Sequence, residues 1–258
     1  MTIYHMTGAG NDFMVCDVRG LELDLQVLSI ELCKLTGADG FLAVDRSDTA
    51  DFRLHFYNSD GLRGEMCGNG ARCVCRFAYD MGIAGETMTV QTDAGFVFGQ
   101  RLSKSQYRIA LNTPGILDLH RKGDAAYVEL GDPGIPHAVL EIPDLHWEDR
   151  EHLRERAKRL RFDPAFPKGA NVNLYTRLDE RTIRILTYER GVEDYTLACG
   201  TGSASVAVVL WTLGALPGGV LTAENPGGNL TVTVSGANGT VDRLTLEGPT
   251  EYLKTYTL

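Results

Sequence analysis

The sequence predicts an α/β protein built from two similar domains. Segments rich in β-branched and aromatic residues, which favour strands, outnumber helical segments along the 258 residues. One helical run, SASVAVVLWTLG at 203–214, is apolar on nearly every face, as expected of a helix enclosed by sheet. A cysteine followed by Gly-x-Gly occurs twice, at Cys67 and, 132 residues further along, at Cys199. This repetition at about half the chain length indicates two equivalent domains.

The elements follow from local patterns taken in order. Four helices are expected, near residues 23–35, 71–82, 148–161 and 203–213. Strands are expected where β-branched and aromatic residues alternate with polar ones between Gly, Asn and Asp turns. These segments are ADFRLHFYN (50–58), TMTVQT (87–92), FVFGQRL (96–102), YRIALN (107–112), TIRILTY (182–188), LTVTVSG (230–236), RLTLEG (243–248) and EYLKTYTL (251–258).

The internal repeat extends beyond the two cysteines. GADG at 37–40 matches GANV at 169–172 with the same offset, and FYNSDG at 56–61 falls near TYERG at 187–191. Such a repeat predicts two similar domains facing each other, with equivalent sites where they meet. The boundary is expected in LNTPGILDL at 111–119. The first domain is then residues 1–114, joined by the C-terminal strand 250–258, and the second is residues 115–249.

Composition excludes several classes of protein. The formal net charge is −9 and there is no basic stripe, so nucleic acid is not an expected partner. No apolar run approaches the roughly 20 residues that span a bilayer, and the N-terminus lacks the pattern of a signal peptide, so we expect a cytoplasmic protein with no membrane partner. Six cysteines, none in a Cys-x-x-Cys pair, support neither a disulfide scaffold nor paired zinc knuckles.

The repeated cysteines suggest a specific chemistry. A cysteine at the start of a helix has its thiolate stabilised by backbone N–H groups and by the positive end of the helix dipole. The same N–H groups bind a carboxylate. Two such sites facing each other would place one thiol on each side of an α-carbon, which suits a racemase. The alternative, that Cys67 and Cys199 are small apolar fillers in glycine turns, does not explain their repetition.

Five motifs carry a resemblance to a known family: HMTGAGNDF, TGADGFLAV, FYNSDGLRGEMCGNGARC, GANVNLY and YERGVEDYTLACGTGSASV. Together they resemble the diaminopimelate epimerases, which interconvert LL- and meso-diaminopimelate without pyridoxal phosphate. The resemblance implies two pseudosymmetric domains, each a β-barrel-like sheet around a central helix, with the active site at the domain seam. It further implies a small-molecule amino-acid substrate, no cofactor and no metal, and a role in lysine and peptidoglycan precursor synthesis. We also expect a homodimer.

The resemblance assigns roles to individual residues. The two bases fall on Cys67 and Cys199, and His137 and Glu189 are expected beside them to assist thiol ionisation and hold the α-ammonium group. The carboxylate cradle falls on Gly68, Asn69, Gly200 and Thr201. Further substrate contacts are expected from Asn11, Asn58, Asn171 and Arg190, with Arg190 binding the distal carboxylate. Without the resemblance, these asparagines would be read as turn residues and Arg190 as a solvated surface charge.

Three departures from the family pattern leave the substrate open. Ile135 in GIPH stands where family members commonly have Asn, Tyr195 extends the segment before the second cysteine by one residue, and Thr7 replaces a common His. A racemase for another polar amino acid such as histidine is therefore an alternative. A non-catalytic amino-acid-binding protein is a second, but it would not require both thiols.

Overall fold

The computed structural model describes residues 1–64 and 67–257. The chain forms two units: unit 1 is Met1–Ala110 with Glu247–Leu258, and unit 2 is Leu111–Leu246. The boundaries expected from the sequence, at 114/115 and 249/250, lie a few residues further along. The second division falls inside a strand, β16 (Thr240–Pro249), which continues from unit 2 into unit 1.

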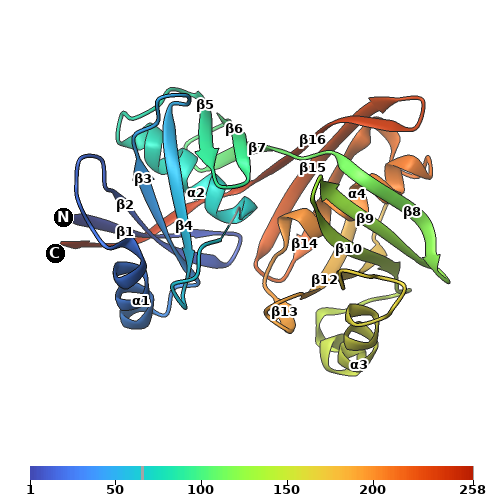
Figure 1. Cartoon of the computed structure of the whole chain (residues 1–258). Coiled ribbons are helices and arrows are strands. Elements are labelled where there is room, and N and C mark those ends of the chain that lie inside the picture. The colour runs from blue at the N-terminus through green and yellow to red at the C-terminus, as the bar shows by residue number, and fades with distance from the viewer. Residues whose placement is uncertain (65–66, 258) are drawn as a thin grey trace. The chain divides into compact units, whose positions relative to one another are not determined.

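Unit 1 consists of strands around one buried helix (Figure 1). Its elements are β1 (Thr2–Gly8), β2 (Asn11–Asp17), α1 (Leu25–Thr36), β3 (Gly40–Asp45), β4 (Phe52–Asn58), α2 (Gly68–Asp80), β5 (Thr87–Thr92), β6 (Gly95–Arg101), β7 (Gln106–Leu111) and β17 (Glu251–Thr257). The central helix α2 packs against β1, β2, β3 and β6. Eleven of its residues are buried, so the sheet covers nearly its whole circumference.

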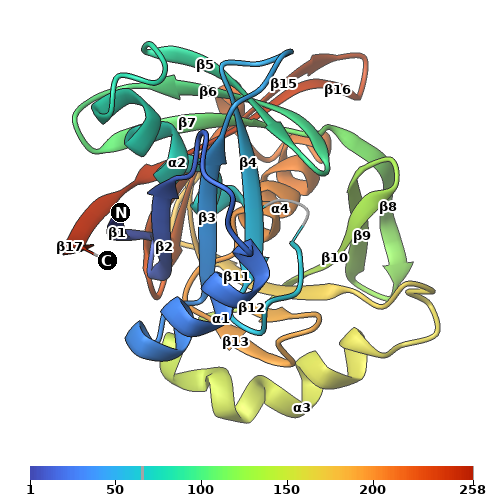
Figure 2. The same ribbon diagram turned by 60° about the vertical axis from the view of Figure 1, so that its left-hand side comes forward.

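Unit 2 has the same plan, with α4 in the central position (Figure 2). Its elements are β8 (Pro114–Lys122), β9 (Ala125–Gly131), β10 (Gly134–Glu141), the 3₁₀ turn Trp147–Asp149, α3 (Arg150–Arg161), β11 (Asn171–Arg177), β12 (Thr182–Glu189), β13 (Asp194–Thr196), α4 (Gly200–Thr212), the 3₁₀ turn Pro217–Gly219, β14 (Val220–Asn225) and β15 (Gly228–Ala237). Helix α4 packs against β9, β10, β11, β14 and β15.

Strand pairing shows that the two units repeat one topology. In unit 1, β1–β2 is antiparallel, β2–β3 parallel, β3–β4 antiparallel, β4–β5 parallel and β5–β6 antiparallel. In unit 2, β9, β10, β11, β12, β14 and β15 pair in the same sequence of directions. The helices α1 and α3 occupy equivalent places in the chain, as do α2 and α4. The expectation of two pseudosymmetric α/β domains is confirmed.

All four expected helices are present, but two begin earlier than predicted. Helices α2 and α4 start at Gly68 and Gly200, three residues before the predicted starts. The glycines of the Cys-Gly-x-Gly motifs therefore belong to the first helical turn and not to a preceding loop. Packing explains why glycine occupies this helical turn, because a Cβ on Gly202 would lie 2.2 Å from Oδ1 of Asn173 on β11. Close approach of the sheet outweighs the poor helix propensity of glycine.

Several strands were not among the predicted ones, including β2, β3, β10 and β11, which lead to the candidate site. β3 contacts α1 and α2, and β11 contacts α3 and α4. β2 and β10 contact α2 and α4, and on their other faces they join the hydrophobic clusters that contain residues of α1 and α3. β3, for example, has five consecutive buried residues. Such strands do not alternate between apolar and polar residues, so the period-two signal is missing.

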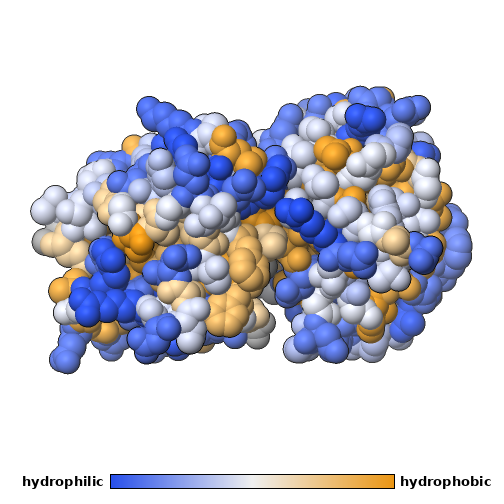
Figure 3. Space-filling model, turned by 90° about the horizontal axis from the view of Figure 1, so that it is seen from above, coloured by the Kyte–Doolittle hydropathy of each residue, from blue (hydrophilic) through white to orange (hydrophobic). Residues whose placement is uncertain are grey.

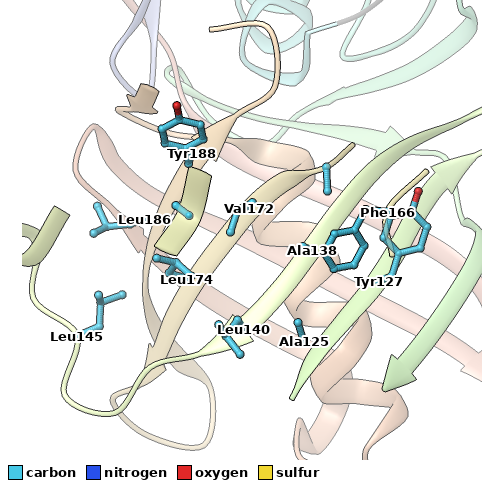
Figure 4. Packing of buried hydrophobic residues seen from close by; sticks show 12 residues of the cluster. Ala125, Tyr127, Ala138, Leu140, Leu145, Phe166, Val172, Leu174, Leu186 and Tyr188 are labelled. Atoms are coloured by element: carbon cyan, nitrogen blue, oxygen red, sulfur yellow. The ribbon is translucent and has the colours of Figure 1, made fainter. Parts of the chain in front are cut away.

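The outer face of each sheet packs against the peripheral helix. In unit 2 a hydrophobic cluster joins β9–β12 to α3, and Figure 4 shows its side chains converging from these strands. Tyr127 and Phe166 stack there with ring centroids 5.4 Å apart. Because side chains alternate along a strand, this cluster fixes which residues face the opposite helix, α4. The residues that alternate with the cluster, and so lie on the face toward α4, are His137, Asn171, Asn173, Thr187 and Glu189.

No helix in residues 1–64 and 67–257 is long and apolar enough to cross a membrane. The face of the molecule in Figure 3 carries hydrophilic and hydrophobic residues side by side.

Candidate active site

Both candidate thiols occupy the N-cap of a central helix. Cys67 precedes α2 with φ −128° and ψ 121°, and Cys199 precedes α4 with φ −118° and ψ 109°. In the described part of the chain neither cysteine side chain makes a capping hydrogen bond, whereas Asp24 caps α1 by accepting from two backbone N–H groups. The first-turn N–H groups of α2 and α4 are thus suited to bind an anion.

The strand register aligns the other site positions of the two units. Phe13 pairs with Gly40 across the parallel β2–β3 pair, and His137 pairs with Asn171 across β10–β11. Counting back two residues along β2 and β10 makes Asn11 the counterpart of Ile135. The β3–β4 and β11–β12 pairs likewise make Asn58 the counterpart of Glu189. Asn11 and Ile135 therefore lie at equivalent ends of equivalent strands, and so do Asn58 and Glu189. Within each pair the side chains differ in chemistry.

In unit 1 an amide chain runs across the start of α2. Asn69 is 3% exposed, and its Nδ2 donates to Oδ1 of Asn11. Asn11 Nδ2 in turn donates to Asp39 at 3.3 Å, and the backbone N–H of Asp12 donates to the same carboxylate oxygen at 3.0 Å. The structure thus brings together Cys67, Gly68, Asn69 and Asn11. Asn58 lies outside this chain of amides, at the exposed end of β4 opposite Gly40.

In unit 2 the first turns of α4 place one hydroxyl group beside the second thiol and another beside its backbone carbonyl. Cys199 is 7% exposed, and its Sγ lies 3.5 Å from Oγ1 of Thr201. The hydroxyl of Ser203 donates to the Cys199 carbonyl at 3.1 Å. A Cβ on Gly200 would lie 2.4 Å from the side chain of Leu246, so packing requires glycine directly after the thiol.

Two more predicted residues of unit 2 are held by hydrogen bonds. The hydroxyl of Thr196 donates to Oε1 of Glu189 at 2.6 Å. Asn171 accepts from the backbone N–H of Arg190 at 2.8 Å through Oδ1 and donates to the carbonyl of Pro136 at 3.3 Å through Nδ2. Asn171 therefore fixes the start of the loop that carries Arg190.

His137 is a buried, neutral hydrogen-bond donor. Its Nδ1 lies 3.2 Å from Nδ2 of Asn173, whose orientation is set because Oδ1 accepts from Thr187 and Nδ2 donates to the carbonyl of Ala138. Nδ1 therefore accepts and Nε2 carries the proton. Within the described residues Nε2 has no hydrogen-bond partner. Such an N–H group suits a thiolate or carboxylate acceptor, and in this tautomer it cannot accept from an ammonium group.

The histidine also gives the protein a predictable acid sensitivity. Burial, and secondarily the charge of Arg190, lowers the pKa of His137 from 6.5 to about 3. Between pH 6.5 and about pH 3 the unfolded chain binds a proton at His137 that the folded chain does not. The contribution of His137 to the free energy of unfolding is therefore fully present above pH 6.5 and is lost as the pH falls through this window. We expect this histidine to contribute a loss of about 1.4 kcal/mol per pH unit in that window.

Urea unfolding of the wild type and His137→Gln at pH 4 to 7 measures this contribution. The difference in unfolding free energy between them should change steeply with pH, because the glutamine does not titrate. His120→Gln, at an exposed position, is the control and should follow the wild-type curve. Parallel curves for wild type and His137→Gln would contradict the buried neutral state.

Sequence reasoning did not single out Asn173, Thr187, Thr196, Asp39 or Arg72. Asn173 and Thr187 could have been found, because they lie two residues from Asn171 and Glu189 and share their face of the sheet.

Tyr195, the unusual residue before the second cysteine motif, is a packing residue. Its ring packs edge-on against Tyr188 at 5.6 Å and adjoins the cluster under α3, with the hydroxyl buried. It is therefore part of the packing of the outer face.

Comparison with known proteins identifies the family. The family model of diaminopimelate epimerase matches residues 3–104 and 131–251. A diaminopimelate epimerase of Aquifex aeolicus is 34% identical over 244 residues, covering 86% of each chain. Another, of Chlorobaculum tepidum, is 33% identical over 261 residues, covering 98% of this chain and all of the relative.

Solved structures share the fold at low sequence identity. A phenazine biosynthesis protein of the PhzF family from Bacillus anthracis superposes with a TM-score of 0.73 at 15% identity, covering 100% of this chain and 98% of the other. A hydroxyproline epimerase from Agrobacterium vitis gives a TM-score of 0.70 at 15% identity, covering 100% and 90%. These likenesses concern architecture, while the sequence matches span both halves of the chain and both cysteine motifs. The chain belongs to the diaminopimelate epimerase family.

Proposed function

We propose that this protein interconverts LL- and meso-diaminopimelate by proton transfer between the substrate α-carbon and the thiols of Cys67 and Cys199. The product would enter lysine and peptidoglycan precursor synthesis. The observation that carries the proposal is the repetition of one arrangement in both units: a cysteine at the N-cap of a buried helix, followed by glycine and by a small polar residue. Relatives named diaminopimelate epimerase that match nearly the whole chain support the choice of substrate.

The proton balance requires one thiolate and one thiol at the start of each turnover. The thiolate takes the α-proton and becomes a thiol, while the electron pair of the broken C–H bond is delocalised into the carboxylate. The other thiol then protonates the opposite face of the carbon and becomes the thiolate. The enzyme ends with the two protonation states exchanged, and the reverse reaction restores them. The proposal requires both thiols to reach one α-carbon in the working enzyme.

Developing charge on the substrate carboxylate is the main electrostatic demand of this reaction. Backbone N–H groups in the first turns of α2 and α4 would stabilise it, with Asn69 and Thr201 lining the cradle. The Nε2–H of His137 would donate to the thiolate or to the carboxylate. Glu189, held by Thr196, would accept from the α-ammonium group. These roles follow from the donor and acceptor character of each group.

One observation favours a second candidate, a racemase for a different polar amino acid. Ile135 is the counterpart of Asn11, so unit 2 lacks the amide that unit 1 has at the same strand position. Loss of one polar contact changes the chemistry near the start of β10 and would alter selection at the distal end of the substrate. The thiol machinery would be unchanged.

Isotope exchange distinguishes these functions. Each of LL-diaminopimelate, L-histidine, L-lysine and L-glutamate is incubated with the protein in deuterated water, and α-deuterium and inversion are followed by NMR and chiral chromatography. We expect diaminopimelate to acquire α-deuterium and invert with the highest kcat/KM, because Arg190 and the neighbouring amides match a second carboxylate and ammonium group.

Each other outcome has a definite meaning. Tenfold higher kcat/KM on another amino acid would reject diaminopimelate and retain the two-thiol mechanism. Binding without exchange of any substrate would indicate an amino-acid-binding protein and reject catalysis.

A further inference from the structure

Arg72, in the second turn of α2, is a buried cation that none of the roles above uses. Its side chain is fully buried, and no carboxylate forms an ion pair with it among the described residues. Nη2 donates to Oδ1 of Asn69 at 2.8 Å and Nη1 donates to the carbonyl of Gly68 at 3.2 Å. Nε is buried without a hydrogen-bond partner. The guanidinium group therefore lies against the first turn of its own helix.

This location is electrostatically unfavourable unless an anion is nearby. A guanidinium remains protonated in proteins, and a helix N-terminus already carries partial positive charge. A buried charge without compensation costs several kcal/mol. A residue that breaks a local rule in this way commonly marks a functional site.

The groups whose negative charge would act on Arg72 are thiolates. Burial lowers the pKa of Arg72, and the charged forms of Cys73, Cys67 and Cys75 act in the opposite direction. Cys73 and Cys75 are fully buried, and burial raises the pKa of each to about 12. Cys67, at the N-cap of the helix, is the one of these three thiols that is partly exposed.

Other charged groups around α2 lie on the neighbouring strands. Asp12 on β2 raises the pKa of Cys73 and pairs with His5 of β1 at 3.4 Å, and Asp39 before β3 accepts from Asn11. Further along α2, Arg76 lies by Asp80 at 3.4 Å. Arg72 is thus the cation nearest in the chain to the first helical turn.

We propose that Arg72 is a positioning residue that stabilises the thiolate of Cys67 and holds the amide of Asn69 in one orientation. The hydrogen bond to Oδ1 directs Nδ2 of Asn69 toward Asn11, so the guanidinium organises the whole amide chain. The proposal rests on the function proposed above only in giving the Cys67 thiolate a catalytic use.

Thiol alkylation measures this without substrate. Iodoacetamide labelling at pH 5 to 10, with peptide mapping, gives a separate apparent pKa for Cys67 and for Cys199. Arg72→Met should raise the apparent pKa of Cys67 by about one unit, a tenfold change in the ionisation constant, and leave that of Cys199 unchanged.

Two further variants separate charge from structure. Arg72→Gln keeps an N–H donor for Asn69 but removes the charge. It should raise the apparent pKa of Cys67 as Arg72→Met does. Arg76→Met is the control, because it removes a buried arginine of the same helix that donates to the carbonyl of Thr250. This variant should leave the apparent pKa of Cys67 unchanged. Circular dichroism confirms folding of each variant.

The proposal is overturned if a folded Arg72→Met or Arg72→Gln variant keeps the wild-type apparent pKa of Cys67. Because labelling needs no turnover, these results stand whether or not diaminopimelate is the substrate.

Discussion

Cys67→Ala and Cys199→Ala are each expected to abolish inversion of diaminopimelate. Each thiol serves one face of the α-carbon in the proposed mechanism, so removal of either leaves no group to take or return the proton on that side. Loss of a positioned acid or base costs at least about 10²- to 10⁴-fold in rate. Inversion is measured by chiral chromatography from both the LL- and the meso-epimer.

Cys75→Ala is the matched control. Cys75 lies on the same helix as the first thiol but is fully buried, with its Sγ directed toward Gly99 of β6. We expect this variant to retain inversion and to lose only some stability. Wild-type inversion by a folded Cys67→Ala or Cys199→Ala protein would refute the two-base mechanism.

Arg190→Lys is expected to lower kcat/KM for diaminopimelate by about 10- to 100-fold, since hydrogen bonds to charged groups contribute about 1.5–3 kcal/mol and lysine cannot reproduce the planar fork. The loop that carries Arg190 is fixed by Asn171 through the backbone N–H and by Nη1 donation to the carbonyl of Lys168 at 3.2 Å. The exposed guanidinium can reach a ligand while its backbone is held.

Comparison of substrates and variants makes the Arg190 test specific. The loss should be much smaller for α-deuterium exchange into lysine, which lacks the second carboxylate. Arg177→Lys, at an exposed ion pair with Glu141 in the same unit, should behave as the wild type. An equal loss on both substrates would show that Arg190 acts on the α-carboxylate or on folding and not on the distal group.

The sequence was sufficient for the parts of the protein that depend on local pattern. The apolar run after Cys199 predicted a helix covered on all sides, and ten residues of α4 are buried. The paired cysteine motifs predicted equivalent helix starts, because a thiol, two glycines and an apolar run are contiguous in the chain. Residues two apart on a helix point away from each other, so Cys73 and Cys75 are typical of packing residues and not of a metal site, and both are fully buried.

Tertiary structure decided what depends on contacts between distant segments. Strands β3 and β11 were missed because helices cover both faces, and the glycines of α2 and α4 are helical because strands approach them closely. The tautomer of His137 depends on Asn173, 36 residues away, and its neutral state depends on burial that no local pattern encodes.

Arg72 illustrates the same limit most clearly. In the sequence GNGARC it reads as a solvated helix arginine, since charged residues are usually exposed. The sheet around α2 removes that option, and the side chain turns back to the first turn, where it donates to Asn69 and to the carbonyl of Gly68. The sequence by itself determined the family, the repeat and the two thiols, because these are carried by contiguous residues. Only the tertiary structure decided the protonation of His137 and the surroundings of Arg72, because burial and electrostatic partners come from segments that folding brings together.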